Sequence, residues 1–208
     1  MSWEVFSLIG TIAFTVSGAY VAMEEEYDIL GVFVLGLVTA FGGGVIRNLL
    51  IGVDVTMLWQ QGLYLKTAVL ATIIIFILPI GWIRRWKNFE VILDAVGLSA
   101  FAIQGALYAT ERQLPLSAVI VAAMLTGIGG GIIRDVLAGR KPLVLREEIY
   151  AVWAIMAGAV IHFGWMTTPV QLYALFVLVI ILRMMSVYYG WKLPRRSLHE
   201  PQRHIETK

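Results

Sequence analysis

A duplicated segment is the feature of this chain that most constrains its fold. Residues 8–52 and 95–139 align without a gap after a shift of 87 positions, and 17 of the 45 aligned residues are identical. Each copy ends in a glycine triplet and an arginine, which are Gly42, Gly43, Gly44 and Arg47 in the first and Gly129, Gly130, Gly131 and Arg134 in the second. Chance matches among apolar residues would not align two triplets and two arginines, so we interpret the chain as an internal repeat.

The composition places this repeat in a membrane. Hydrophobic residues make up 59% of the 208 residues, charged residues 14%, and the mean hydropathy is +0.81. Runs of roughly 17 to 25 apolar residues suffice to cross a bilayer, and the sequence holds seven: 5–23, 29–50, 63–82, 91–109, 116–137, 149–165 and 169–190. The sequence therefore predicts an all-α integral membrane protein with seven transmembrane helices, although the short run 149–165 also fits a re-entrant or interfacial segment.

The basic residues between the spans predict the orientation of the chain. Cytoplasmic loops carry an excess of Lys and Arg, and an outside N-terminus would put 11 basic residues on the inner side, against Arg112 and Lys66 outside. We therefore expect a multi-pass protein of the cell inner or plasma membrane with a cytoplasmic C-terminus. The inner basic residues could also bind anionic lipid head groups, although topology alone explains them; they include Arg84, Arg85, Lys87, Arg140 and Lys141.

The number of spans in each copy predicts how the two copies are related. Each copy holds three spans, so the second enters the membrane with the opposite polarity to the first. The predicted units are a first three-helix repeat in residues 1–90, an inverted second repeat in 91–168, a seventh helix in 169–190 and a basic cytoplasmic tail in 191–208. Inverted repeats are typical of transporters, whose working site lies near the midplane where the halves meet.

The glycine triplets predict a weak point in the second and fifth spans. Each glycine costs roughly 1 kcal/mol relative to alanine inside a helix, so each triplet favours a kink or a break. A break would expose carbonyl groups near Thr39 and Thr126, which suits a cation, and amides beyond the triplet, which suit an anion. The alternative is that the small residues merely let two helices touch closely.

Arg47 and Arg134 follow the triplets by one turn, where an arginine is costly unless it faces the protein interior or water. The symmetry fails at the next residue, because Asn48 in the first copy corresponds to Asp135 in the second. Neighbouring residues point to different sides of a helix, so we predict that Asp135 pairs across the repeat with Arg47. The alternative is that both arginines lie near the interface and extend their charged ends into water.

Few other polar residues lie inside the predicted spans. Ser17 and its counterpart Gln104 lie beside glycines on a face that could line a path, and Asp94 is interpreted as a helix-start carboxylate at the interface. His162 has no second metal ligand near it in the sequence. The chain has no cysteine, no Gly-Lys-Ser/Thr phosphate loop and no paired catalytic carboxylates. We therefore expect no enzyme, metal, cofactor or nucleic-acid partner.

These motifs resemble a known family. Both copies contain Gly-x-x-Ala-Phe-x-x-x-Gly-Ala followed by Gly-Gly-Gly-x-Ile-Arg-Asn/Asp. Over residues 5–190 the chain is similar to the bacterial trimeric intracellular cation (TRIC) channels, a family that is also labelled as glycine transporters. The resemblance implies seven spans, a homotrimer in the lipid bilayer with one pore in each subunit, and conduction of monovalent cations, K⁺ or Na⁺, with a preference for potassium.

The resemblance also indicates which residues surround the pore. The second and fifth helices of the family are kinked at the glycine triplets, which here are Gly42–Gly44 and Gly129–Gly131. The remaining pore or gating candidates are Ser17, Thr39, Arg47, Asn48, Thr126, Arg134 and Asp135. Because arginines repel cations, we expect them to gate the path or cap helix ends, while Asp135 and the threonines supply the negative side.

A carrier is the alternative function. The inverted repeat favours a secondary transporter by general precedent, and an arginine beside helix-start amides could bind the carboxylate of a small amino acid such as glycine. The resemblance favours a channel instead. The sequence thus leads to two functional hypotheses, a potassium-favouring channel and a glycine carrier.

Overall fold

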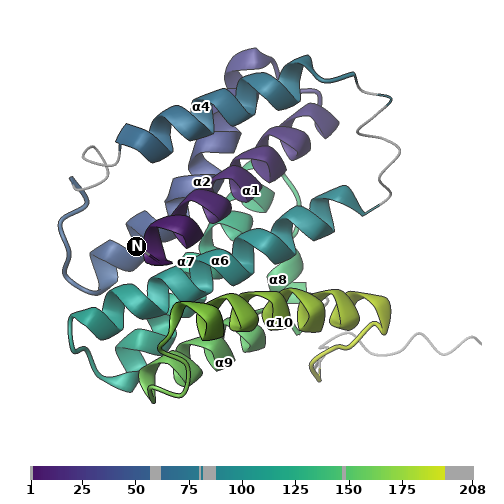
Figure 1. Ribbon diagram of the computed structural model, residues 1–208. Helices are drawn as coiled ribbons and strands as arrows, with labels where there is room; N and C mark the ends of the chain where they lie inside the picture. Colours follow the sequence, from purple (N-terminus) through teal and green to yellow (C-terminus); the bar gives the residue numbers. More distant parts are fainter. Residues whose placement is uncertain (1, 57–61, 80, 82–87, 147–148, 195–208) are drawn as a thin grey trace, which may run out of the picture.

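The computed structural model describes residues 2–56, 62–79, 81, 88–146 and 149–194, and the regular elements in these ranges are helices (Figure 1). In chain order they are α1 (Ser2–Glu24), α2 (Ile29–Leu50), α4 (Gly62–Ile77), α6 (Phe89–Glu111), α7 (Leu116–Leu137), α8 (Leu143–Arg146), α9 (Ala151–His162) and α10 (Pro169–Tyr188). Most of these helices are strongly apolar. The described chain is therefore the all-helical membrane protein that the composition predicted.

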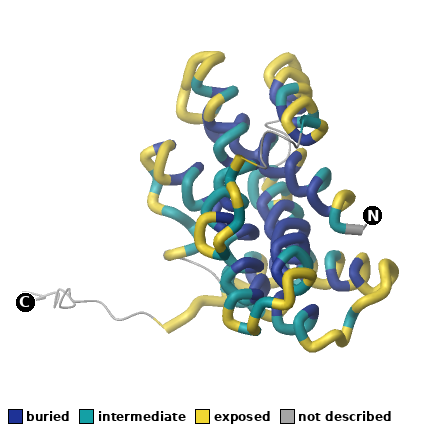
Figure 2. The backbone as a smooth tube through the Cα atoms, turned by 90° about the vertical axis from the view of Figure 1, so that its left-hand side faces the viewer, coloured by how far each residue is buried: buried dark blue, intermediate teal, exposed yellow. Residues whose placement is uncertain are grey.

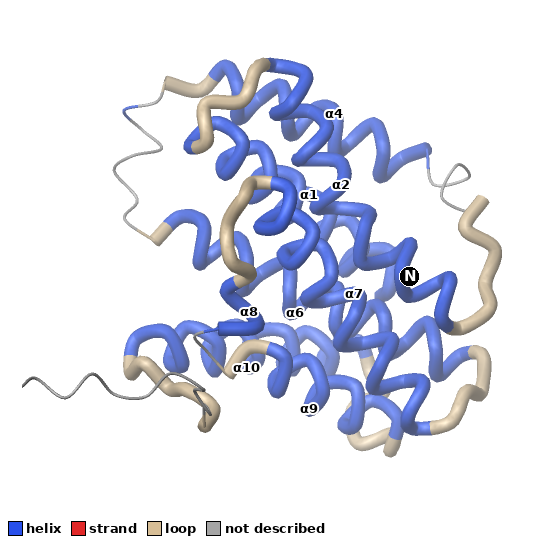
Figure 3. The backbone as a smooth tube through the Cα atoms, turned by 180° about the vertical axis from the view of Figure 1, so that it is seen from behind, coloured by secondary structure: helices blue, strands red, loops and turns tan. Residues whose placement is uncertain are grey.

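Two helices, α1 and α6, form the centre of the bundle. They pack along each other, and α2 and α7 pack on them and against one another (Figures 1 and 3). α4 lies beside α1 at one edge, and α9 and α10 lie beside α6 at the other. Figure 2 shows the buried residues gathered along the middle of the bundle and the exposed residues on its outside. The polar side chains of the central helices are thus enclosed by protein.

Five of the predicted spans are helices long and apolar enough to cross a bilayer: α1, α2, α6, α7 and α10. The other two are shorter, since α4 has 16 residues and α9 has 12. At 1.5 Å per residue α9 extends about 18 Å, against a hydrocarbon core about 30 Å thick. The length of α9 therefore fits the re-entrant or interfacial segment that was the alternative prediction for residues 149–165.

Local signals determine where several of these helices begin and end. The Asp28 side chain accepts a hydrogen bond from the Gly31 N–H at 2.8 Å and so caps the start of α2. Thr168 caps α10 in a reciprocal capping box, with proline at the first helical position. After α2 and α7 the chain turns at Gly52 and Gly139, whose φ angles are 70° and 71°, a conformation that glycine adopts without strain.

The glycine triplets do not break their helices. α2 runs without interruption through Gly42–Gly44, and α7 runs through Gly129–Gly131. A break, which was one of the two predicted outcomes, is therefore wrong, whereas a kink stays a prediction. The structure shows close helix contact at the triplets. A Cβ on Gly130 would lie 2.1 Å from the Thr39 carbonyl oxygen, and one on Gly43 would lie 2.8 Å from the Thr126 carbonyl oxygen. Close packing of two backbones offsets the weak helix propensity of glycine.

Equivalent positions of the two sequence copies touch each other in pairs. The Phe101 ring lies where a Cβ of Gly10 would be, at 2.6 Å, and the Phe14 ring lies where a Cβ of Gly97 would be, at 2.1 Å. The two rings meet edge to face with centroids 5.3 Å apart. Each phenylalanine of the central pair of helices therefore occupies the space left by the glycine of the other copy.

Gly130→Ala should destabilise the protein, whereas Gly131→Ala should not. The new methyl group at residue 130 would meet the backbone of α2, whereas at residue 131 its nearest neighbour is an Asp94 oxygen at 3.7 Å, an ordinary contact. Overpacking of this kind costs about 1–3 kcal/mol. Thermal unfolding of both purified variants in detergent measures the difference. Equal stability of the two variants would contradict the close crossing of α2 and α7.

Candidate functional site

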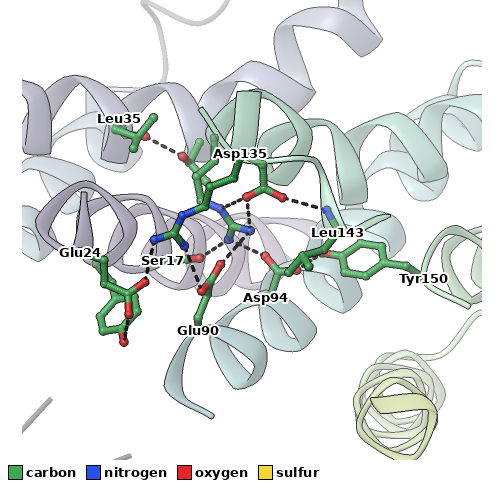
Figure 4. Close-up of polar contacts among 12 residues, drawn as sticks. Ser17, Glu24, Leu35, Glu90, Asp94, Asp135, Leu143 and Tyr150 are labelled. Atoms are coloured by element: carbon green, nitrogen blue, oxygen red, sulfur yellow. Dashed lines mark hydrogen bonds and ion pairs between the residues drawn. The ribbon is translucent and has the colours of Figure 1, made fainter. Parts of the chain in front are cut away.

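Arg134, in α7, lies in a cluster of acidic side chains. Figure 4 labels the three carboxylates of this cluster, which are Glu90, Asp94 and Asp135. Its Nη1 contacts Asp94 Oδ1 at 2.8 Å and its Nη2 contacts Glu90 Oε1 at 3.2 Å, both on α6. Its Nε and Nη2 contact Asp135 Oδ1 at 2.8 and 2.7 Å. Nη1 also donates a hydrogen bond to Ser17 Oγ of α1 at 2.5 Å. Arg134 is only 1% exposed, so three carboxylates balance one buried positive charge.

Two further hydrogen bonds hold these carboxylates in place. The hydroxyl of Tyr150, just before α9, donates to Asp94 Oδ2, and the N–H of Leu143 in α8 donates to Asp135 Oδ2 at 3.1 Å. The guanidinium carbon of Arg183 in α10 lies 4.5 Å from the centre of the Tyr150 ring. The cluster thus joins α1, α6 and α7 directly and reaches α8, α9 and α10 through these contacts.

Arg140, just beyond α7, extends the cluster to the end of α1. Its Nε contacts Glu25 Oε1 at 2.6 Å, and its Nη2 contacts Glu24 Oε2 at 3.0 Å. Its Nη1 lies 3.6 Å from Glu90 Oε2, so Glu90 bridges the two arginines. Partial burial lowers the pKa of Arg140, but the hydrogen bonds to Glu25 and Glu24 outweigh this effect and raise the pKa. Arg140 therefore remains charged.

Arg47, the counterpart of Arg134 in the first copy, has neutral partners. Its Nε and Nη2 donate to Asn48 Oδ1 at 3.0 and 2.8 Å, and its Nη1 donates to Gln104 Oε1 at 2.8 Å. The guanidinium carbon lies 4.4 Å from the centre of the Tyr108 ring, a cation–π contact. Arg47 is 3% exposed. Among the described residues, no carboxylate lies within ion-pair distance of it.

A pocket lies beside Arg47, and Arg134 is not among the residues that line it. Its polar lining comes from four long helices and α4, and consists of Arg47 with Ser7, Thr11, Asn48, Tyr64, Gln104 and Thr126. Phe101, Ala40 and Gly44 add an apolar part. Neither Asp94 nor Asp135 lines this pocket. The two arginines therefore lie in chemically different surroundings, one among carboxylates and one beside a neutral polar pocket.

The structure corrects the predicted partners of both arginines. Asp135 pairs with its neighbour Arg134, and Arg47 pairs with Asn48 and Gln104, so the predicted ion pair of Arg47 with Asp135 is wrong. An arginine side chain is long enough to fold back alongside the next residue although the two Cβ atoms point apart. The two arginines are also buried, which excludes the alternative that they extend into water.

The remaining predicted positions are placed as follows. Ser17 contacts Arg134, and Gly44 and Asn48 line the pocket beside Arg47. The hydroxyls of Thr39 and Thr126 donate to carbonyls of their own helices at Leu35 and Ala122. Among the predicted lipid ligands, Lys141 is exposed and Arg140 is held in ion pairs, whereas Arg84, Arg85 and Lys87 lie outside the described residues.

Four residues that contact the two arginines or their partners were not selected as site residues from the sequence: Glu90, Asp94, Tyr108 and Tyr150. Glu90 and Asp94 are four residues apart on α6, and this spacing puts two carboxylates on one helix face, which is a signal that could have been used. The interpretation of Asp94 as an interfacial helix-start carboxylate is wrong, because it is 4% exposed and contacts Arg134. Tyr150 lies outside the aligned repeat, and Tyr108 has no polar counterpart in the first copy, so nothing in the sequence marked them.

Asp135→Asn should cost more stability than Glu90→Gln. The Asp135 side chain is 4% exposed and meets the guanidinium at two nitrogens, whereas Glu90 is 20% exposed and meets Arg134 at one. Breaking a buried pair costs about 3–5 kcal/mol, whereas a partly exposed pair contributes about 0–1 kcal/mol. Unfolding of the two purified variants in denaturant measures the losses. A larger loss for Glu90→Gln would contradict this ranking of the carboxylates.

Comparisons with known proteins agree with this arrangement. A family model described as "Glycine transporter" matches residues 4–79 and again 91–167. The "UPF0126 membrane protein YvgT" of Bacillus subtilis is 60% identical over 197 residues, which are 95% of this chain and 98% of that protein. Both matches extend over most of the chain, so they include the helices that carry Arg47 and Arg134.

Solved structures give the same result for the fold. A structure described under "conductance through TRIC cation channels" is 34% identical with a TM-score of 0.80, over 95% of this chain and 98% of that one. The TRIC orthologue from Rhodobacter sphaeroides is 31% identical with a TM-score of 0.78, over 91% and 98%. The chain therefore belongs to the bacterial family that is described both as TRIC cation channels and as glycine transporters.

Proposed function

We propose that this protein is a channel for monovalent cations that favours potassium, with a pore inside each protomer near the crossing of α2 and α7. The observation that carries this proposal is the similarity, at 31–35% identity and over more than nine tenths of the chain, to solved TRIC cation channels.

The overall arrangement belongs to the same proposal. In it, α1, α2 and α4 form one repeat, α6, α7 and α9 form the inverted repeat, and α10 is the seventh helix. The reciprocal contacts of Phe14 with Gly97 and of Phe101 with Gly10 support a two-fold relation between the halves. In the proposed orientation the N-terminus lies outside and the C-terminus lies in the cytoplasm. Three protomers assemble in the membrane. Lys141 and the neighbouring basic residues face anionic lipid.

The charges around Arg134 support a path for cations. Arg134 and Arg140 carry two positive charges, and the five carboxylates that contact them carry five negative ones, which leaves a net charge of −3 on these groups; the carboxylates are Glu24, Glu25, Glu90, Asp94 and Asp135. A net negative cluster raises the local concentration of cations. In the proposed orientation it lies at the cytoplasmic end of the bundle.

A glycine carrier is the second candidate function. The observation that favours it is the pocket beside Arg47, whose guanidinium has neutral partners and could bind a substrate carboxylate. The description of the matching family model as a glycine transporter points the same way. The two functions differ in what Arg47 does, since it would repel the permeant ion of a channel and bind the substrate of a carrier.

Flux through purified protein in liposomes distinguishes the two functions. Potassium release and uptake of labelled glycine are measured side by side, with empty liposomes as the control. We expect fast potassium release that glycine does not change, and no saturable glycine uptake. Saturable uptake without potassium release would contradict the channel and support the carrier.

Arg47→Gln provides a second distinction, with Lys66→Gln as the matched control because Lys66 is exposed on α4 and loses the same charge. In a channel, removing the buried positive charge should leave potassium flux unchanged or raise it. In a carrier, loss of the carboxylate partner should lower glycine uptake by about tenfold or more. A loss of potassium flux in Arg47→Gln alone, with normal stability, would contradict the role given to Arg47.

A further inference from the structure

The two copies of the repeat place different side chains around their buried arginines. The same shift of 87 positions that aligns Arg47 with Arg134 places Asn48 opposite Asp135 and Ser7 opposite Asp94. Both carboxylates that lie closest to Arg134 are therefore replaced by neutral side chains around Arg47. A buried guanidinium without a counter-charge is costly, because its desolvation is not offset by attraction to an anion.

The pocket beside Arg47 lies next to the two positions that hold aspartates in the second copy. Ser7 and Asn48, which replace the two aspartates, both line the pocket beside Arg47. The pocket has a volume of about 40 Å³, and a buried water needs roughly 10–15 Å³ by this measure. It can therefore hold a small ion or a carboxylate group with a water molecule, and not a large organic molecule.

The groups facing this pocket include hydrogen-bond donors. A guanidinium carries five N–H groups, and three of them donate to Asn48 and Gln104 within the described structure. The oxygens of these two amides accept these bonds, and both amides also carry an NH₂ group, which is a donor, on residues that line the pocket. A positive charge surrounded by donors is the arrangement that binds an anion.

We propose that Arg47 and Asn48 bind a small monovalent anion in this pocket, either a halide or a free carboxylate. The bound anion takes the place that Asp94 and Asp135 hold beside Arg134. One guanidinium supplies one positive charge, which matches a single negative charge and not a divalent anion. Under the proposed channel function, the anion would also reduce the repulsion that Arg47 exerts on a passing cation.

Binding of bromide to the full-length protein in detergent tests this proposal. The protein is first placed in the sodium salt of a bulky sulfonate as the reference anion, and sodium bromide then replaces this salt stepwise at constant ionic strength. The unfolding temperature is measured at each step for three proteins: the wild type, Asn48→Asp and Lys66→Gln. Asn48→Asp supplies the carboxylate that the second copy has at Asp135. Lys66→Gln removes an exposed positive charge from a residue that does not line the pocket.

We expect the unfolding temperature of the wild type and of Lys66→Gln to rise with bromide and to saturate, because the ligand binds the folded state. In Asn48→Asp the apparent affinity should fall by about tenfold or more, because the new carboxylate occupies the site. The same rise in all three proteins, or no rise of the wild type with bromide, acetate or glycine, would overturn the proposal.

A second measurement does not depend on how well the variants fold. Crystals of the wild type soaked in bromide should show an anomalous scattering peak within contact distance of the Arg47 guanidinium, and a peak only elsewhere would contradict a halide at this site. Acetate and glycine titrations identify the source of the anion. Binding of bromide and acetate supports a general anion site, and binding of acetate and glycine without bromide supports a carboxylate site. These measurements use no flux, so their failure is separate from failure of the channel proposal.

Discussion

A positive charge inside a membrane protein has to be balanced, and this constraint shapes the packing around Arg134. Its guanidinium contacts groups on α1, α6 and α7, and the residues that hold its carboxylates bring in α8, α9 and α10. The bundle is therefore held together at this end by charge and hydrogen bonds as well as by packing. In a bilayer, where lipid is as apolar as the side chains, such contacts matter more than hydrophobic burial.

The glycine triplets supply the second condition for this arrangement. They allow α2 and α7 to cross with their backbones in contact, near Thr39, Thr126 and the two arginines that follow one turn later. With a side chain at Gly43 or Gly130 the helices would stand farther apart. The arginines would then reach different neighbours, so the glycines position the charged groups although they carry no chemistry themselves.

The sequence predicted the membrane class, the long helices and the pairing of the two arginines inside the spans, because hydropathy and the repeat are properties of the chain order. It did not predict the partners of the arginines. Helical spacing indicates where a Cβ points, but the end of an arginine side chain can fold back to Asp135 or cross to Gln104. The break at the glycine triplets was wrong for a related reason, since helix propensity ignores the packing of a neighbouring backbone. Tyr150 was missed because no pattern connects it to Asp94.

The order of the partners along the chain has a consequence for how the protein is made. Ser17, Glu90 and Asp94 all precede Arg134, the last two by no more than one helical hairpin, so acceptors for this guanidinium are already synthesised when α7 follows. For Arg47 the order along the chain is reversed, because its partner Gln104 comes 57 residues after it. α2 therefore carries a buried positive charge whose distant partner does not yet exist when it leaves the ribosome. Until α6 has been made, the hydrogen-bond partner that Arg47 has in its own helix is Asn48. The first copy of the duplication therefore needs the second to complete the contacts of its arginine, whereas the direct partners of Arg134 on α1, α6 and α7 need nothing that comes after α7.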